Sequence, residues 1–484
     1  MVSGNGFGRA IRWNTLGSLS RAIAALFVQV CLMRLLGPEI LGQFAIYLLI
    51  VGFGTILSDG GIGSALVRSP QFSHQLLRVG LFWTFVYSSC VALSIVALQE
   101  SIARVLGIRE ADRSLIVYAA LTIVPLALSS VPMSVLRREY RALEAQVIQL
   151  SAYIISFLFV SLPVAIYFPS VWALIAAFIL QTLLALCATW IVGHCPLVPT
   201  WRGGRDLLTY GAKGVVVNMA QFINESIDNA FISHYLGPRS LGLYSMSFNL
   251  GRAPTDAIVS VIQSPLLVSS AHEQDDSAVA ARRYIEILNA SICLVMPIYL
   301  FVALFPEVII KTLLGKNWIE AAPILGIIGI VMALRLLGSI SGAVLWGRNR
   351  LGFDLTAQMM GIATFCIGFW IFPIEDVYHA AYVTLAAYGI RSIILIGSAV
   401  KFAWVDGINF LRDILAPMAS TVLMMIPAII VDYLLISLSS PFRFFVLAFV
   451  FTITYAFKVR LEVGQTHFEW QRRVAAFVSR VTTP

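Results

Sequence analysis

The sequence has few charged residues for its length. They make up 12% of the 484 positions, while hydrophobic residues make up 59%; a soluble domain carries about 25% charge. A soluble chain of this length would divide into domains with charged outer surfaces, so the composition excludes an ordinary soluble protein. The sequence contains repeated apolar blocks of about 20 residues, the length at which a helix spans a bilayer. A strand barrel would show shorter, alternating segments. We therefore predict an all-α integral membrane protein.

The sequence also lacks the motifs of several kinds of site. It has no Walker A loop, no His-Glu-x-x-His and no Gly-x-Ser-x-Gly, and its six cysteines form no Cys-x-x-Cys pair. No catalytic motif, disulfide framework or metal site is indicated, and we expect no cofactor. The net charge of +8 does not come from a basic cluster in a soluble domain. An excess of basic residues in cytoplasmic loops explains it better than nucleic-acid binding does.

About fourteen apolar segments are long enough to cross a bilayer, and the loops between them are too short to fold as soluble domains. With the N-terminus in the cytoplasm, twenty basic residues fall in inside segments and eight in outside loops. This bias predicts that both termini are cytoplasmic, which twelve spans would also satisfy. The predicted spans are 14–36, 41–66, 76–98, 114–136, 144–167, 171–193, 208–235, 241–268, 285–306, 320–346, 352–372, 378–400, 413–435 and 441–458.

A short motif occurs twice. Residues 36–42 read Leu-Gly-Pro-Glu-Ile-Leu-Gly, and residues 236–242 read Leu-Gly-Pro-Arg-Ser-Leu-Gly. Each copy ends one span and begins the next, where Gly ends a helix and Pro starts one. Six spans separate the copies, so the two halves run parallel, as in transporters with a central substrate site. The predicted parts are an N-terminal lobe (1–200), a C-terminal lobe (201–402), an extra helix pair (403–458) and a cytoplasmic amphipathic or frayed tail (459–484).

Four arginines fall deep within the predicted spans: Arg21, Arg252, Arg335 and Arg391. A charge at the bilayer centre costs on the order of 3 kcal/mol, so such residues normally face a cavity or a partner. Arginine suits bidentate contact with phosphate oxygens. We expect a cationic cavity that binds an anionic diphosphate head group. The alternative is structural ion pairing, for example between Arg252 and Asp256 at i,i+4 spacing.

The seventh predicted span carries a polar stripe. Its members share one helical face and are Gln221, Asn224, Glu225 and Asp228. Because two of them are carboxylates, Glu225 and Asp228 are candidates for a proton or cation site that couples transport to an ion gradient. The alternative is hydrogen bonding between helices. In the tenth span, Gly338-x-x-x-Gly342 predicts close helix packing.

Five stretches resemble Wzx-type polysaccharide flippases, which belong to the multidrug/oligosaccharidyl-lipid/polysaccharide exporter superfamily. They are residues 34–44, 58–67, 131–140, 228–244 and 314–318. The resemblance covers most of residues 10–350 and fades beyond them. Asp228 matches an acidic position that is common in the family's seventh helix. The arginines match no family motif, and their assignment rests on burial.

The resemblance implies two six-helix lobes around a central cavity, with two further C-terminal helices. It also implies an undecaprenyl-diphosphate-linked oligosaccharide as substrate. The protein would move this substrate across the bacterial inner membrane by alternating access, for exopolysaccharide or O-antigen export. A polysaccharide polymerase and co-polymerase are possible partners.

Other functions stay open. A multidrug exporter of the same superfamily would favour an acidic cavity, whereas arginines predominate here. A lipid II flippase is also possible. A membrane polymerase or ligase often carries a large periplasmic loop, and no loop here exceeds roughly 15 residues. A scaffold without transport is a further alternative.

Overall fold

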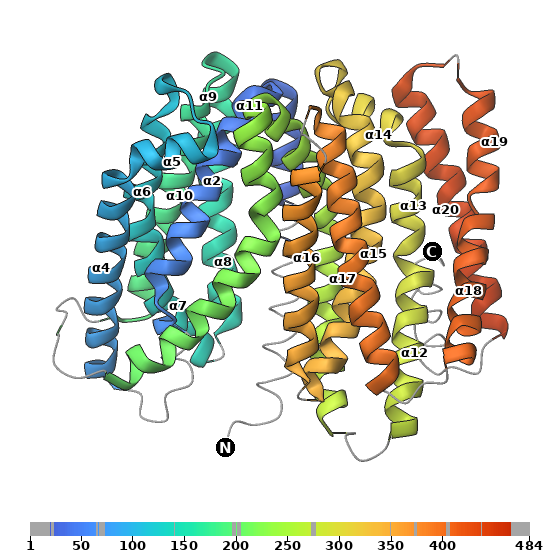
Figure 1. Ribbon diagram of the computed structural model, residues 1–484. Helices are drawn as coiled ribbons and strands as arrows, with labels where there is room; N and C mark the ends of the chain where they lie inside the picture. The colour runs from blue at the N-terminus through green and yellow to red at the C-terminus, as the bar shows by residue number, and fades with distance from the viewer. Residues whose placement is uncertain are drawn as a thin grey trace. The chain divides into compact units, whose positions relative to one another are not determined.

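The computed structural model describes residues 20, 24–63, 66, 73–139, 141–195, 200, 205–272, 277–348, 350–371, 375–402, 407–436 and 438–465. Every regular element in these ranges is helical, which confirms the predicted all-α class. The chain divides into two compact units, which are described separately (Figure 1). The first unit is Met1–Met246 with Ile371–Ala380, and the second is Ser247–Trp370 with Ala381–Pro484.

In the first unit, α2, α4, α6 and α10 lie side by side (Figure 1). Helix α2 ends at Gly60, which has a φ of 53°, and α5 ends at Gly107, which has a φ of 64°. Both are left-handed C-caps, a conformation that glycine adopts at little cost. The elements are α2 (Pro38–Asp59), α4 (His74–Ala97), α5 (Gln99–Leu106), η1 (Glu110–Asp112), α6 (Ser114–Leu128), α7 (Ser130–Arg138), α8 (Ala142–Tyr153), the π-helical η2 (Ile154–Ser161), α9 (Leu162–Tyr167), α10 (Val171–Val192) and α11 (Arg205–His272) as far as Met246.

The second unit begins within α11 and continues to the last helix. Several of its helices start with proline in the first turn, where the missing N–H costs nothing. The elements that follow α11 are α12 (Ser277–Leu294), α13 (Met296–Leu304), α14 (Pro306–Leu313), η3 (Lys316–Ala321), α15 (Ala322–Gly347), α16 (Leu351–Ile371), α17 (Val377–Phe402), α18 (Gly407–Leu423), α19 (Ile426–Leu434) and α20 (Ser440–Gln465).

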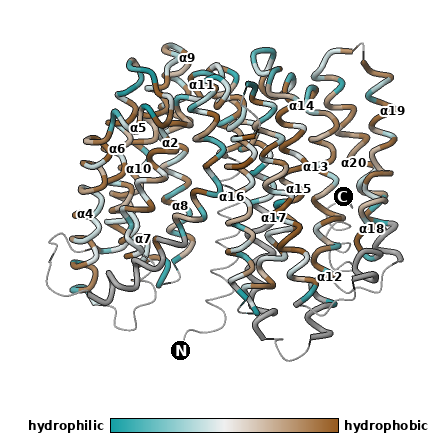
Figure 2. Tube along the Cα trace, viewed as in Figure 1, coloured by the Kyte–Doolittle hydropathy of each residue, from teal (hydrophilic) through white to brown (hydrophobic). Residues whose placement is uncertain are grey.

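Eleven helices among the described residues are long and apolar enough to cross a membrane, and each overlaps a predicted span. In Figure 2, hydrophobic residues run along the helix bodies, and several hydrophilic stretches lie near the helix ends. The chain is therefore a multi-pass membrane protein. Of the first predicted span, the described part is the shorter helix Ala24–Leu35. The seventh and eighth spans form one element, α11, interrupted by the non-helical Gly237. The total of fourteen stays a prediction, and the tail after 465 lies outside the described residues.

An arginine next to α8 joins neighbouring helix ends in the first unit. Arg141 donates hydrogen bonds to Glu144, at 2.8 and 2.5 Å, and to the carbonyl of Val192 at the end of α10, at 3.1 Å. The hydrogen bonds that Arg141 donates to the carboxylate of Glu144 raise the pKa of Arg141 above its usual range. A cation is favourable beside the last carbonyls of a helix. Arg141 thus caps the C-terminal end of α10.

The two Leu-Gly-Pro copies contact each other within the first unit. A Cβ added to Gly42 would lie 1.7 Å from the carbonyl oxygen of Pro238, and one added to Gly242 would lie 1.9 Å from that of Pro38. Both distances are far below van der Waals contact, so the backbones touch at these glycines. The contact is reciprocal, as expected for two copies related by an approximate two-fold axis. The repeat found in the sequence is therefore a packing motif.

Candidate functional site

Helices α15 and α17 of the second unit approach closely at one glycine. A Cβ on Gly338 would lie 2.9 Å from Oγ of Ser392, and this hydroxyl donates to the carbonyl of Leu334 at 2.8 Å. A residue without a side chain allows this approach, as in other membrane helix pairs. The predicted close packing at Gly338 is confirmed. Gly342 has more room, because its nearest neighbour, Oδ1 of Asp354, is 4.0 Å from the added Cβ position.

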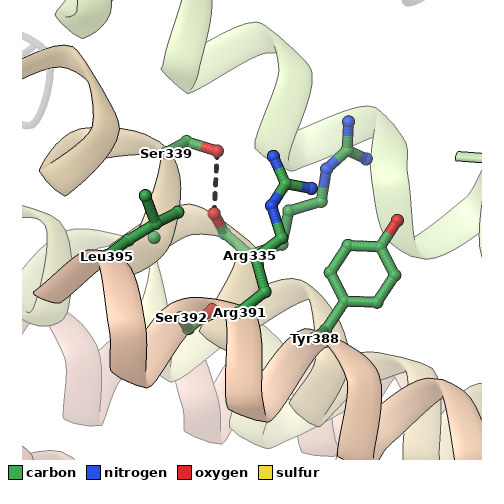
Figure 3. A pocket seen from close by; sticks show the side chains of 7 residues that line it. Arg335, Ser339, Tyr388, Arg391, Ser392 and Leu395 are labelled. Atoms are coloured by element: carbon green, nitrogen blue, oxygen red, sulfur yellow. Dashed lines mark hydrogen bonds between the residues drawn. The ribbon is translucent and has the colours of Figure 1, made fainter. Parts of the chain in front are cut away.

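Arg335 of α15 and Arg391 of α17 line one cavity beside this crossing. The cavity has a volume of about 190 Å³, and its other lining residues are Gly338, Ser339, Tyr388, Ser392 and Leu395. Figure 3 shows the two guanidinium groups projecting in the same direction, with the ring of Tyr388 beside them. The hydroxyl of Ser339 is turned to the backbone and donates to the carbonyl of Arg335 at 2.8 Å (Figure 3). The arginine head groups therefore give the cavity its charge.

A third arginine joins this cluster through a carboxylate. Nε of Arg252 donates to Oδ2 of Asp256 at 2.7 Å, and the other oxygen of Asp256 lies 3.6 Å from a terminal nitrogen of Arg335. The predicted i,i+4 pair is therefore present, and it is extended to a second helix. This group contains three arginines and one carboxylate. We name Arg252, Asp256, Arg335 and Arg391 the arginine cluster.

The buried Nε–H donor of Arg391 has no hydrogen-bond acceptor among the described residues. An unsatisfied buried polar atom costs about 1–3 kcal/mol, more for a charged group. A buried polar group without a partner is uncommon in folded proteins, so this position calls for an explanation by function or by local structure.

The acidic candidates Glu225 and Asp228 belong to the first unit. Asp228 is 1% exposed and accepts a hydrogen bond from the Tyr244 hydroxyl at 2.6 Å and one from the backbone N–H of Asn229 at 2.8 Å. Glu225 is partly buried, and its carboxylate faces Gln221, whose amide donates to it at 3.4 Å. Asp228 thus bridges the two sides of the Gly237 interruption, a contact that the sequence analysis missed.

The remaining candidate, Arg21, lies outside the described residues. Apart from the i,i+4 spacing of Asp256 to Arg252, nothing in the sequence indicated the positions of Tyr388, Ser392 and Asp256 near these arginines. They depend on which helices pack together. Within the described ranges, the structure contains no group of three or more His, Cys, Asp or Glu that could hold a metal ion.

The comparisons with known proteins agree with this architecture. The chain is 24% identical to the succinoglycan biosynthesis transport protein ExoT of Rhizobium meliloti, over 66% of this chain and 65% of that protein. It is 20% identical to the lipopolysaccharide biosynthesis protein WzxC of Escherichia coli, over 73% and 72%. Both relatives belong to polysaccharide biosynthesis, and ExoT is a transport protein; the prediction of a transporter in this process rather than an enzyme is confirmed.

A solved structure of the lipid II flippase MurJ in an inward closed conformation has the same fold. It superposes with a TM-score of 0.76 at 15% identity, over 93% of this chain and 98% of that one. The family described as polysaccharide biosynthesis protein matches residues 31–323, more than half of the chain. The resemblance to Wzx-type flippases is thereby confirmed, and the chain belongs to the polysaccharide biosynthesis protein family.

Proposed function

We propose that this protein flips undecaprenyl-diphosphate-linked oligosaccharide units across the bacterial inner membrane by alternating access. The observation that carries the proposal is the arginine cluster, in which Arg335 and Arg391 face one cavity and Arg252 joins them through Asp256. Membership of the polysaccharide biosynthesis protein family and the similarity to the succinoglycan transport protein ExoT support a lipid-linked sugar as substrate.

The chemistry of the cluster fits a diphosphate. Arginine in a membrane helix costs about 3 kcal/mol unless it faces a cavity or a partner, and its planar head group forms paired hydrogen bonds with phosphate oxygens. We therefore assign this cavity to the phosphates of the head group and not to the sugars.

The rival substrates differ in charge or in sugar. A cationic drug would be repelled by Arg335 and Arg391, which line the cavity, and this argues against a multidrug exporter. A lipid II flippase would bind the same diphosphate, so only the sugar separates that alternative from ours. The relatives ExoT and WzxC are proteins of succinoglycan and lipopolysaccharide biosynthesis, which favours a polysaccharide repeat unit.

Ion coupling through Glu225 and Asp228 is part of the proposal. The burial of Asp228 and the polar face around it support this role. A carboxylate retained inside a membrane helix is a functional candidate by default. Docking of a polymerase and a co-polymerase is also proposed, from the family alone, as are Arg21 in the substrate path and cytoplasmic termini.

Deletion of the gene in its native host tests the proposal. Loss of a flippase strands lipid-linked repeat units in the inner leaflet, whereas loss of a polymerase leaves single flipped units outside. We expect labelled lipid-linked units that periplasmic probes cannot reach, and restoration by the wild-type protein. Restoration by a protein in which Arg252, Arg335 and Arg391 are all changed to Gln would contradict the role of the arginine cluster.

A further inference from the structure

The carboxylate of Asp256 lies closer to one arginine than to the other. Its Oδ2 accepts a hydrogen bond from Arg252 on its own helix at 2.7 Å, while its Oδ1 lies 3.6 Å from Arg335. A charge-assisted hydrogen bond between such groups measures about 2.7–2.9 Å. Asp256 is therefore held by Arg252 and faces Arg335 at a distance from which it can separate.

A second ion pair in the same unit shows what a structural pair looks like in this protein. Arg443 of α20 donates two hydrogen bonds to Asp432 of α19, both at 2.6 Å, with side chains 19% and 22% exposed. The side chain of Asp256 is 47% exposed, while that of Arg335 is 12% exposed. The contact between Asp256 and Arg335 is thus longer, and its acidic partner is more exposed.

The position of Asp256 makes it a competitor for the site. Arg335 contributes to the cavity that it shares with Arg391, so phosphate oxygens bound there would approach the cation that Asp256 faces. A carboxylate next to the bound phosphates would repel them. Without substrate, however, Arg335 still needs an anion nearby, because its side chain is only 12% exposed and a buried charge without a counterion is strongly unfavourable. Asp256 can neutralise Arg335 in the absence of substrate and still allow phosphates to bind, provided that it exchanges with them on Arg335.

We propose that Asp256 is an exchangeable counterion. It neutralises Arg335 when no substrate is present, and the diphosphate oxygens of the lipid-linked sugar replace it on Arg335 when substrate binds. This inference rests on the proposed function. Asp256 then sets how tightly the head group is held and how fast it leaves, because its return to Arg335 assists release. Removal of its charge tightens binding and slows dissociation.

Binding of farnesyl diphosphate to the full-length protein in phosphatidylcholine nanodiscs tests the exchange. We expect Asp256→Asn to lower the Kd by roughly tenfold and to slow dissociation in a stopped-flow chase. Arg335→Gln should raise the Kd. The matched control is Glu286→Gln, which removes the carboxylate of another i,i+4 pair, with Arg282 at 3.2 Å, and should leave the Kd unchanged. Asp256→Ser serves as a second variant if Asp256→Asn does not fold.

Two results would overturn the exchange. If both Asp256 variants bind farnesyl diphosphate with wild-type affinity or more weakly, Asp256 orients the arginines and does not compete with the ligand. If phosphatidylglycerol in the nanodiscs displaces farnesyl diphosphate at equal mole fraction, the exchanged anion is a bulk lipid head group. A wild-type protein that binds farnesyl diphosphate no better than farnesol would instead contradict the proposed function itself.

Discussion

Two regions of the molecule are built in opposite ways. In the first unit, the Leu-Gly-Pro copies touch through their backbones, and neither Gly42 nor Gly242 has room for one methyl group. In the second unit, Arg335 and Arg391 of the arginine cluster line a cavity, and the side chain of Asp256 is 47% exposed. The first region is tightly packed backbone, whereas the second contains a cavity and a carboxylate that we propose is exchangeable.

This difference separates two kinds of substitution. A change at the backbone contact must move main chain, so its effect appears in the stability of the folded protein. A change at Arg335 or Arg391 removes a head group that faces a cavity, so its effect appears in transport while the fold is kept.

The largest effect is expected for the double change Arg335→Gln with Arg391→Gln. Loss of two charge-assisted phosphate contacts at about 1.5–3 kcal/mol each should reduce polymer export at least about a hundredfold. Export is measured in a complemented deletion strain, and thermal unfolding of the purified protein should stay within a few degrees of wild type. Arg282→Gln is the control, because the side chain of Arg282 is 69% exposed and lies outside the arginine cluster. Normal export by the double variant would mean that the cavity does not bind substrate.

The next largest effect is expected for Gly42→Ala. The new Cβ would meet the carbonyl oxygen of Pro238, a backbone atom that cannot rotate away, and overpacking of this kind costs about 1–3 kcal/mol or more. Thermal unfolding in detergent should show a clearly lower midpoint. Gly37→Ala is the control within the same motif, because nothing lies within 4 Å of its Cβ position. Equal midpoints for the two variants would show that the backbone contact is not rigid.

A smaller effect is expected for Gly237→Ala. The two Leu-Gly-Pro glycines have the same neighbours in sequence, yet Gly37 has a φ of −74° and Gly237 a φ of 77° with a ψ of −176°. The latter region is almost restricted to glycine and costs other residues about 1–3 kcal/mol, without any clash to add to it. Gly237→Ala should therefore lower the unfolding midpoint while Gly37→Ala does not. A midpoint as low for Gly37→Ala would remove the difference between the copies.

The sequence was sufficient for the features that depend on local pattern. Apolar runs located eleven helices that the structure confirms, and the Leu-Gly-Pro repeat marked a pair of segments that touch. The i,i+4 spacing identified the bond between Arg252 and Asp256. The sequence could not show that Asp256 also faces Arg335 or that Arg335 and Arg391 share a cavity. These facts depend on the packing of α11, α15 and α17, which apolar periodicity does not encode.

The last prediction concerns the hydrogen bond between Tyr244 and Asp228, a buried carboxyl group beside the Leu-Gly-Pro contact and a candidate for ion coupling. Tyr244→Phe removes a 2.6 Å hydrogen bond but keeps the carboxylate, and should cost about 1 kcal/mol of stability. Asp228→Asn removes the ionisable group. If Asp228 couples transport, only Asp228→Asn should blunt substrate movement driven by an imposed ion gradient in proteoliposomes. If both variants respond to the gradient as wild type does, Asp228 fixes the Gly237 interruption and exchangeable charge is confined to the second unit. If Asp228→Asn alone fails, each of the two regions carries a charge that works in transport, and the contrast between them holds for packing only.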